Sequence, residues 1–428
     1  MCLNYAKHFF LPITIGIFLT NAEISNAQNS NRENAPYSRY GIGELRNGLN
    51  TPLKGMGSIS SAYFNPYNVN TDNPASYATL KLTTYEAGGE GSVRTVITND
   101  QSFGTGTATL SHLTVGIPLG KNGGLAFGLR PNSRVYYRMR DSVTLDGMGP
   151  SIRTYDGDGS TNYAFIGAAG SYNGFHAGFN FGYLFGTIRN SSILQKQYDT
   201  VNARNSDFSN YTKIGGIYWK VGVLYDKKLK EKLNLHIGGT ATLSQDVNAK
   251  KDSFGIAWRY SNGVPIADTA INIEGLKGQI RLPLSYSLGV LLVGGDQWMA
   301  GVDFSAMQWS QFRNYGIADS VDNAYKIGVG GEYTPNATSL YNYFQRVSYR
   351  LGFYYGQDYI KLHNTTINYY ALTLGASLPF KRSQDRIHTA FELGRRGTEA
   401  NGLIRENFYK LSLGITLNDK WFVKRKYD

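Results

Sequence analysis

Residues 175–185 read Phe175-His-Ala-Gly-Phe-Asn-Phe-Gly-Tyr-Leu-Phe185, and this stretch decides the fold. Every second residue is Phe, Ala, Phe, Phe, Tyr or Phe, whereas most residues between them are Gly, His or Asn. Successive side chains of a β-strand point to opposite faces, so the pattern predicts a strand with one aromatic face and one small or polar face. A soluble β-sandwich shows the same alternation, so features elsewhere in the chain must distinguish a sandwich from a membrane barrel.

The alternation recurs in the segments 233–243, 280–292 and 409–417. Each run has the roughly 9–11 residues that a tilted strand needs to cross a bilayer. No stretch of about 18 apolar residues occurs, which excludes a membrane-spanning helix. The chain contains 50 Gly, 32 Tyr and 21 Phe among 428 residues, which fits one large β architecture rather than several linked domains.

Fourteen antiparallel strands are predicted, an even number, as in bacterial single-chain outer-membrane barrels. They lie at 80–93, 107–119, 123–137, 161–173, 174–188, 212–226, 232–246, 280–293, 297–313, 323–333, 346–357, 367–379, 386–396 and 406–417. Asn122-Gly123 and Asn173-Gly174 predict tight hairpins, whereas 138–160, 189–211 and 247–279 are predicted as longer loops. Short turns at one end and long loops at the other are typical of the periplasmic and extracellular ends of such a barrel. A further strand near Phe254–Tyr260 is an open alternative.

Residues 1–27 have the features of a secretory leader: Lys7, an apolar stretch and small residues before Gln28. The single cysteine, Cys2, lies in this leader, so the mature chain is expected to lack disulfides. The net charge of +12 is compatible with binding to nucleic acid. The predicted export of the chain and the lack of a recognition motif argue against nucleic acid as a partner. The basic residues gather at predicted turns, where they are either solvated or in contact with anionic lipid and lipopolysaccharide.

Residues 28–79 do not alternate and are rich in Asn, Pro, Ser and Gly. Such a segment is either a disordered periplasmic tail or a plug that folds back into the barrel. The predicted domains are therefore a leader at 1–27, an N-terminal hatch at 28–79 and a transmembrane barrel at 80–428.

Catalytic and metal chemistry find no support in the sequence. The six histidines are scattered, and none is paired at metal-ligand spacing. Asp156-Gly-Asp-Gly159 lacks the later ligands of a calcium loop and is interpreted as a flexible loop. We predict no enzyme activity, no cofactor and no metal site, and we interpret Trp219, Trp298, Trp309 and Trp421 as membrane-interface anchors.

Several motifs resemble the FadL family of outer-membrane transporters for hydrophobic compounds. The resemblance is strongest in Leu282-Pro-Leu-Ser-Tyr-Ser-Leu-Gly-Val290 and in the strand that ends in Trp309-Ser310. It continues through 324–353, and Asn73-Pro74-Ala75 is similar to the Asn-Pro-Ala signature of the family's hatch. The resemblance implies a plugged fourteen-stranded barrel, with ligand entry from outside and lateral release at a kink in strand three.

Pro131 and Asn132 interrupt the third predicted strand and are the candidate lateral gate. Proline donates no backbone hydrogen bond, so it marks an edge, a bulge or a break; alternatively, these residues begin an extracellular loop. The sequence thus predicts an outer-membrane channel for passive uptake of fatty-acid-like molecules. The alternative is a docking component of a protein export complex, similar to the type IX secretion shuttle, with protein partners in the outer membrane.

Overall fold

The computed structural model describes residues 33–46, 48–98, 101–198, 203–261, 264–381 and 383–421, so the predicted leader lies outside the described residues. The long strands are β2 (Thr83–Ile97), β3 (Ser102–Leu119), β4 (Gly123–Leu145), β5 (Gly149–Tyr172), β6 (Phe175–Lys196), β7 (Asn205–Lys230), β8 (Leu233–Thr242), β9 (Gln245–Ser261), β10 (Val264–Leu282), β11 (Ser285–Gly294), β12 (Trp298–Met307), β14 (Ala324–Tyr333), β15 (Ser348–Leu362), β16 (Thr365–Pro379), β17 (Arg386–Gly397) and β18 (Arg405–Asp419). The short elements are η1 (Pro36–Arg39), β1 (Glu44–Leu45), α2 (Thr51–Lys54), η2 (Pro74–Thr79), η3 (Trp309–Gln311), β13 (Arg313–Asn314), η4 (Tyr343–Arg346) and η5 (Ala400–Gly402).

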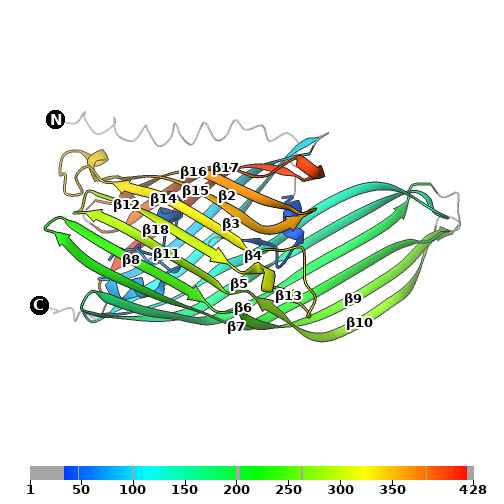
Figure 1. Cartoon of the computed structure of the whole chain (residues 1–428), viewed down its shortest axis with the longest axis horizontal. Coiled ribbons are helices and arrows are strands. Elements are labelled where there is room, and N and C mark those ends of the chain that lie inside the picture. The colour runs from blue at the N-terminus through cyan, green and yellow to red at the C-terminus, as the bar shows by residue number, and fades with distance from the viewer. Residues whose placement is uncertain are drawn as a thin grey trace, which may run out of the picture. The chain divides into compact units, whose positions relative to one another are not determined.

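The strands form a closed antiparallel barrel (Figure 1). β18 pairs with β2 from Arg405–Ile97 to Asp419–Thr83, which joins the last strand to the first. β8 and β9 are two parts of the seventh wall strand, and β10 and β11 are two parts of the eighth. The wall therefore has the predicted fourteen strands. No helix of the described chain is long and apolar enough to cross a membrane.

The alternation in the sequence separates the two faces of the wall. On β6 the odd-numbered residues point outward, and Phe175, Phe181 and Tyr183 are 64%, 45% and 51% exposed. On β18 Tyr409, Leu411, Leu413, Ile415 and Leu417 also face outward. An apolar outer face is stable only against hydrocarbon, so this surface is the lipid-facing band of the barrel.

The predicted loops at 138–160, 189–211 and 247–279 are largely strand, which corrects the sequence interpretation. β4 and β5 pair as far as Leu145–Gly149, and β9 and β10 pair as far as Val264–Ser261. These long hairpins project well beyond the other strands at the right of Figure 1. Nearly every side chain of β10 from Val264 to Glu274 is exposed, so no buried face imposes the alternation by which the other strands were recognised. The alternative strand near Phe254–Tyr260 is confirmed as part of β9.

A break at Pro283-Leu284 reverses the two faces of the eighth strand. Leu288 and Leu292 point outward as predicted, but Ile280 and Leu282 are 2% and 6% exposed and point inward. Proline removes one hydrogen bond from the ladder. The neighbouring seventh wall strand is also interrupted, between Thr242 and Gln245. The register places this break directly opposite the break at Pro283-Leu284.

The tryptophans predicted as interface anchors do not share one environment. Trp298 and Trp421 are 41% and 42% exposed at the end of the barrel with short turns, where interface anchors are expected. Trp309 was wrongly predicted as an anchor, since it is 2% exposed and stacks on Tyr359 with ring centroids 4.3 Å apart.

Residues 33–79, here called the N-terminal segment, lie inside the barrel and are mostly buried. Their apolar core is formed by Leu49, Leu53, Met56, Ile59 and Tyr63, which pack against Leu291 of β11. Inward-facing glycines of the wall leave room for the segment's backbone. A Cβ added at Gly238 would lie 1.9 Å from the Ser61 carbonyl oxygen, and one at Gly352 would lie 2.1 Å from the Gly57 nitrogen.

Substituting Gly238 by valine is expected to displace the N-terminal segment. The new side chain would overlap the Ser61 backbone, and overpacking of this kind costs about 1–3 kcal/mol. Proteolysis of the folded barrel should then cut within residues 33–79, which should be protected in the wild type because they are mostly buried. Gly104→Val is the matched control, because no atom lies within 4 Å of a Cβ at that position. Equal protection of Gly238→Val and Gly104→Val would contradict the packing described above.

Candidate functional site

The Asn73-Pro74-Ala75 motif attaches the N-terminal segment to the wall. Asn73 caps η2 by accepting a hydrogen bond from the Ala75 N–H (3.0 Å), and its amide donates to the Val223 carbonyl of β7 (3.1 Å). A Cβ at Gly222 would lie 2.1 Å from Asn73 Oδ1, so a wall glycine admits the motif. Asparagine is favoured at helix N-caps because its side chain accepts an otherwise free N–H, and here the same side chain also reaches the barrel.

Arg94 of β2 lies at the centre of an ion-pair network between the N-terminal segment and the wall. It donates to both carboxylate oxygens of Glu44 at 2.8 and 2.9 Å and to Glu406 of β18 at 3.1 Å. Arg396 of β17 binds the same Glu406 (3.5 Å) and also Asp358 (2.6 Å). Arg94 and Arg396 are buried, so each depends on these carboxylates to offset the loss of water.

Two lysines make a second set of buried contacts between the segment and the wall. Lys54 of α2 is 2% exposed, and its Nζ binds Glu90 (2.6 Å) and Ser111 Oγ (2.8 Å). At another part of the wall, Lys220 of β7 binds Asp72. The segment is therefore held at two places by charge-assisted hydrogen bonds, which are stronger than neutral ones.

These contacts keep two carboxylates of the N-terminal segment, Glu44 and Asp72, ionised. Burial by itself raises the pKa of Glu44, but Arg94 and Arg46 outweigh it and hold that pKa well below its usual range. Burial likewise raises the pKa of Asp72, and Lys220 outweighs it and lowers that pKa. Both groups are therefore charged at neutral pH.

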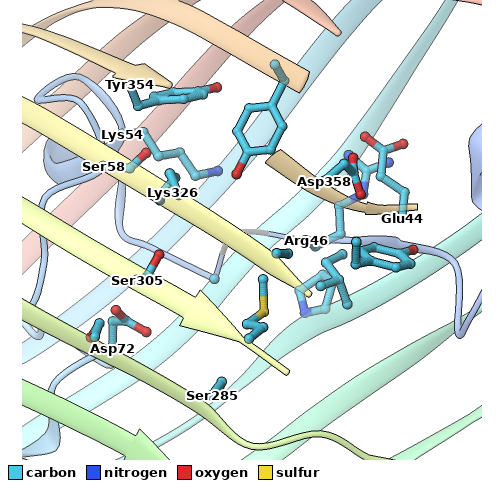
Figure 2. A pocket seen from close by; sticks show the side chains of 18 of the residues that line it. Glu44, Arg46, Lys54, Ser58, Asp72, Ser285, Ser305, Lys326, Tyr354 and Asp358 are labelled. Atoms are coloured by element: carbon cyan, nitrogen blue, oxygen red, sulfur yellow. The ribbon is translucent and has the colours of Figure 1, made fainter. Parts of the chain in front are cut away.

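A cavity of about 370 Å³ lies between the N-terminal segment and the wall. Figure 2 shows Glu44, Arg46, Lys54 and Asp72 of the segment on the same cavity as Lys326 and Asp358 of the wall. Aromatic and thioether side chains complete the lining, among them Tyr218, Tyr286, Met307, Tyr354 and Phe408. The cavity is amphipathic. Its charged residues are six carboxylates and eight cations: Glu44, Asp72, Glu90, Asp358, Glu392, Glu406, Arg46, Lys54, Arg94, Arg130, Lys220, Lys326, Arg396 and Lys410.

Three of these cations, Arg130, Lys326 and Lys410, form no ion pair with a carboxylate of the described chain. Each lies instead over an aromatic ring: Arg130 over Tyr163 at 5.6 Å, Lys326 over Tyr354 at 5.8 Å and Lys410 over Phe408 at 5.0 Å. A cation–π contact offsets only part of the free energy of ion desolvation. The three cations can therefore accept an anionic group whose apolar part packs on the neighbouring rings.

The wall is incomplete between β3 and β4, at the candidate gate. The two strands pair from Leu119–Gly123 only as far as Leu113–Leu129, and the ladder ends one residue before Arg130-Pro131. A bulge between Pro131 and Ser133 interrupts the pairing with β5 as well, at Asn132. Beyond this point β4 continues to Leu145 and β3 extends back to Ser102 without pairing to each other.

Residues 34–45, here called the strap, cross this gap from the lumen side. The Asn34 N–H donates to Thr105 Oγ1 of β3 (2.8 Å), and the Ala35 N–H donates to the Tyr136 carbonyl of β4 (2.8 Å). β1 adds a short antiparallel pairing to β4, with Leu45 opposite Ser133. The strap thus occupies the place beside β4 where β3 no longer pairs.

Both sides of the wall are hollowed at the end of the β3–β4 ladder. The lumen cavity reaches Leu110 of β3 and Pro131 of β4, which are residues on the two edges of the gap. On the outer face an apolar groove of about 780 Å³ begins at the last ladder pair, Leu113 and Leu129. Its other outward-facing residues come from β2 to β7 and β18: Tyr85, Ala87, Val115, Phe127, Ile166, Phe181, Tyr183, Ile217, Ile415 and Leu417.

One group of side chains resembles a catalytic dyad that the sequence analysis did not find. Ser377 Oγ lies 2.5 Å from His388 Nδ1, and His388 Nε2 lies 2.9 Å from Thr416 Oγ1. A nucleophile must reach its substrate, but Ser377 and His388 are 0% and 2% exposed. Arg350 also donates to Ser377 Oγ, so the cluster is a buried hydrogen-bond network of the wall.

The acidic motif at 156–159 is part of β5 and not the predicted flexible loop. Asp156 pairs with Arg138 and Arg189, and Asp158 pairs with Arg189. Arginine side chains, rather than a metal ion, neutralise these carboxylates. Among the described residues, no group of three or more His, Cys, Asp or Glu could hold a metal ion.

The closed wall, the apolar outer band and the occupied lumen define the class of this protein as a bacterial outer-membrane β-barrel of fourteen strands. The chain belongs to the BamG family, whose model matches residues 9–428. No curated relative matches the sequence.

Solved structures confirm the predicted resemblance to FadL at the level of the fold. A FadL homologue from Pseudomonas aeruginosa has a TM-score of 0.59 at 12% identity, covering 88% of this chain and 99% of that one. The P. putida toluene transporter TodX has a TM-score of 0.58 at 15% identity, with 86% and 97% covered. The Ralstonia pickettii toluene transporter TbuX has a TM-score of 0.56 at 14% identity, with 87% and 98% covered.

Proposed function

We propose that the protein is a passive outer-membrane channel for hydrophobic small molecules of the fatty-acid type, with residues 28–79 as its hatch. The observation that carries the proposal is the alignment of three features at Pro131: the lumen cavity, the end of the β3–β4 ladder and the outer apolar groove. A ligand would enter the cavity from the extracellular end and leave sideways between β3 and β4, with Pro131 and Asn132 as the gate. FadL-like structures of similar fold carry names that describe them as toluene transporters, which supports this use of the fold.

The driving force of such a path is the removal of apolar surface from water, at ~25 cal/mol per Å². The lumen cavity supplies part of that surface, and Arg130, Lys326 and Lys410, which pair with no carboxylate among the described residues, supply a site for a head group. The outer groove is almost entirely apolar and faces lipid, so it would receive the chain of the ligand after the gate. No energy source is required, because the ligand moves down its own gradient.

Replacing Lys326 and Lys410 together by methionine tests the proposed ligand class. Charge-assisted hydrogen bonds are worth about 1.5–3 kcal/mol each, so dodecanoate binding to the purified barrel should weaken by at least about tenfold. Dodecanol has the same chain without the charge, and its affinity should stay unchanged. Lys121→Met, in the exposed β3–β4 turn, is the matched control. Equal affinities of the double variant and the wild type for dodecanoate would refute an anionic ligand at this site.

A second candidate is a docking component of a protein complex in the outer membrane. It is favoured by β10, whose residues Val264–Ile273 pair with β9 across one bulge, between Thr269 and Ile271, and expose Ile266, Ile271 and Ile273. An exposed edge of this length is usually paired or covered. Photo-crosslinking from Ile266 in intact cells distinguishes the two candidates, since a stoichiometric protein adduct is expected only for the docking role.

A further inference from the structure

The connection between β14 and β15 differs from every other turn at its end of the barrel. The others are two to six residues long, at 120–122, 173–174, 231–232, 295–297 and 380–385. This one spans residues 334–347 and contains η4; it is the golden coil at the left of Figure 1. Short turns mark the periplasmic end of an outer-membrane barrel, so the long connection lies on the periplasmic side.

The 334–347 connection is folded, although it buries little of its own apolar surface. The Asn336 N–H donates to the Gln345 carbonyl (2.8 Å), and Asn342 Oδ1 caps η4 by accepting from the Phe344 N–H (3.0 Å). Yet Leu340, Tyr341 and Phe344 are 89%, 100% and 66% exposed. Backbone and amide hydrogen bonds thus fix a loop that presents an aliphatic and two aromatic side chains outward. Such a display is unfavourable in water and marks a site of contact with an apolar environment.

The loop is continuous with the lipid-facing surface. Tyr333 and Tyr349 flank it as a cross-strand pair and are 54% and 42% exposed beside Trp298 of the aromatic girdle. The Tyr349 hydroxyl donates to the Phe344 carbonyl at 3.1 Å, which ties η4 to the girdle. These groups lie at the rim of the lipid-facing band, where tyrosine and tryptophan side chains contact lipid head groups.

The charge of the loop favours lipid over a protein partner. Residues 334–347 contain no Asp, Glu or Lys and a single cation, Arg346. The Arg346 guanidinium lies 5.2 Å from the centre of the Tyr343 ring and forms no ion pair with the described residues. A loop with apolar tips and one arginine beside the girdle fits the periplasmic leaflet of the outer membrane. The lipid phosphates would accept hydrogen bonds from the arginine, and the acyl chains would surround the apolar side chains.

We infer that residues 334–347 form an anchor that inserts Leu340, Tyr341 and Phe344 into the periplasmic leaflet of the outer membrane. The anchor fixes the depth of the barrel on the β14–β15 side. It depends only on the lipid-facing band and holds whether or not the barrel transports a ligand.

The test uses the absence of cysteine after residue 2. A protein expressed from residue 28 carries Tyr341→Cys labelled with an environment-sensitive fluorophore and is reconstituted in phosphatidylethanolamine–phosphatidylglycerol vesicles. Emission should shift to shorter wavelength, lose quenching by iodide and gain quenching by lipids with a spin label near the head group. Lys121→Cys, exposed in the β3–β4 turn at the same end, is the control for orientation and should stay open to iodide.

Equal iodide quenching of the labels at 341 and 121 would overturn the inference. A label at 341 that is open in vesicles but protected in native outer membranes, with a cross-link to a protein, would overturn it in favour of protein docking. As a second measurement, Leu340→Ser/Phe344→Ser should retain the heat-induced gel shift of a folded barrel. In that background the label at 341 should become as open to iodide as the label at 121, and a label that stays protected would contradict insertion through these side chains.

Discussion

Replacing Arg94 by alanine is expected to loosen the N-terminal segment and to lower the free energy of unfolding by about 3–5 kcal/mol. The reason is that Arg94 is buried and is shared by Glu44 of the segment and Glu406 of the wall. Its removal leaves two buried carboxylates with less compensation, and an uncompensated buried charge costs more than the ion pair contributes. The temperature at which the folded barrel shifts to its unfolded mobility on a gel measures the effect.

A double-mutant cycle separates the charge effect from lost packing. Glu44→Gln removes the negative partner while it keeps the shape, so the Arg94→Ala/Glu44→Gln protein should be more stable than the sum of the single changes implies. Proteolysis within residues 33–79 should increase in Arg94→Ala and should partly recover in the double variant. Strictly additive losses, with an unchanged protease pattern, would show that the network does not hold the segment.

On the proposed lateral route, a disulfide between the strap and β4 is expected to reduce uptake of hydrophobic ligands by at least about tenfold, since fixing the strap would close that route. Leu45 and Ser133 are cross-strand partners, and the Cα atoms of such partners are about 4.5–5.5 Å apart, which suits a disulfide. Leu45→Cys/Ser133→Cys would therefore fix the strap in its place beside Pro131. Uptake of a radiolabelled fatty acid by cells or vesicles should fall on oxidation and return on reduction.

The matched control is a disulfide in the wall away from the gap. Leu372 of β16 and Leu393 of β17 are also cross-strand partners, and Leu372→Cys/Leu393→Cys should leave uptake the same in both redox states. The single variant Ser133→Cys controls for loss of two hydrogen bonds, the one that Ser133 donates to the Ile42 carbonyl and the one between the Ser133 and Thr161 hydroxyls. Undiminished uptake through the oxidised Leu45–Ser133 pair would place the route away from this gap.

The alternation in the sequence predicted fourteen strands because each crosses lipid with one apolar face, and burial in hydrocarbon selects that face at every second position. The same rule failed in the long hairpins, because strands such as β10 expose both faces and no burial imposes a period. It also failed at Ile280 and Leu282, where the break at Pro283 turns the outward face inward. Trp309 was misplaced because an aromatic residue of a core and one of a girdle look alike in sequence.

The candidate site was only partly predictable. Asn73 was chosen because Asn73-Pro74-Ala75 resembles the hatch signature of the FadL family, and Pro131 because a proline within a strand breaks a short-range pattern. Their roles as hatch motif and gate stay proposals. The network around Arg94 was missed, because Arg94 and Glu406 are 312 residues apart in the chain and no local pattern links them. The only sign of this network in the sequence was a set of isolated charged residues among polar, inward-facing positions. Most such residues in a barrel face water, so they do not by themselves indicate ion pairs.

The sequence by itself determined that the chain forms a lipid-facing barrel of fourteen strands, since alternation is a local property that hydrocarbon enforces residue by residue. Only the tertiary structure decided what the lumen contains: which glycines admit the N-terminal segment, which charges pair across it, and where the β3–β4 ladder ends. Those features depend on groups brought together from distant strands when the barrel closes. Their free energy comes from desolvated contacts that do not exist until that closure occurs.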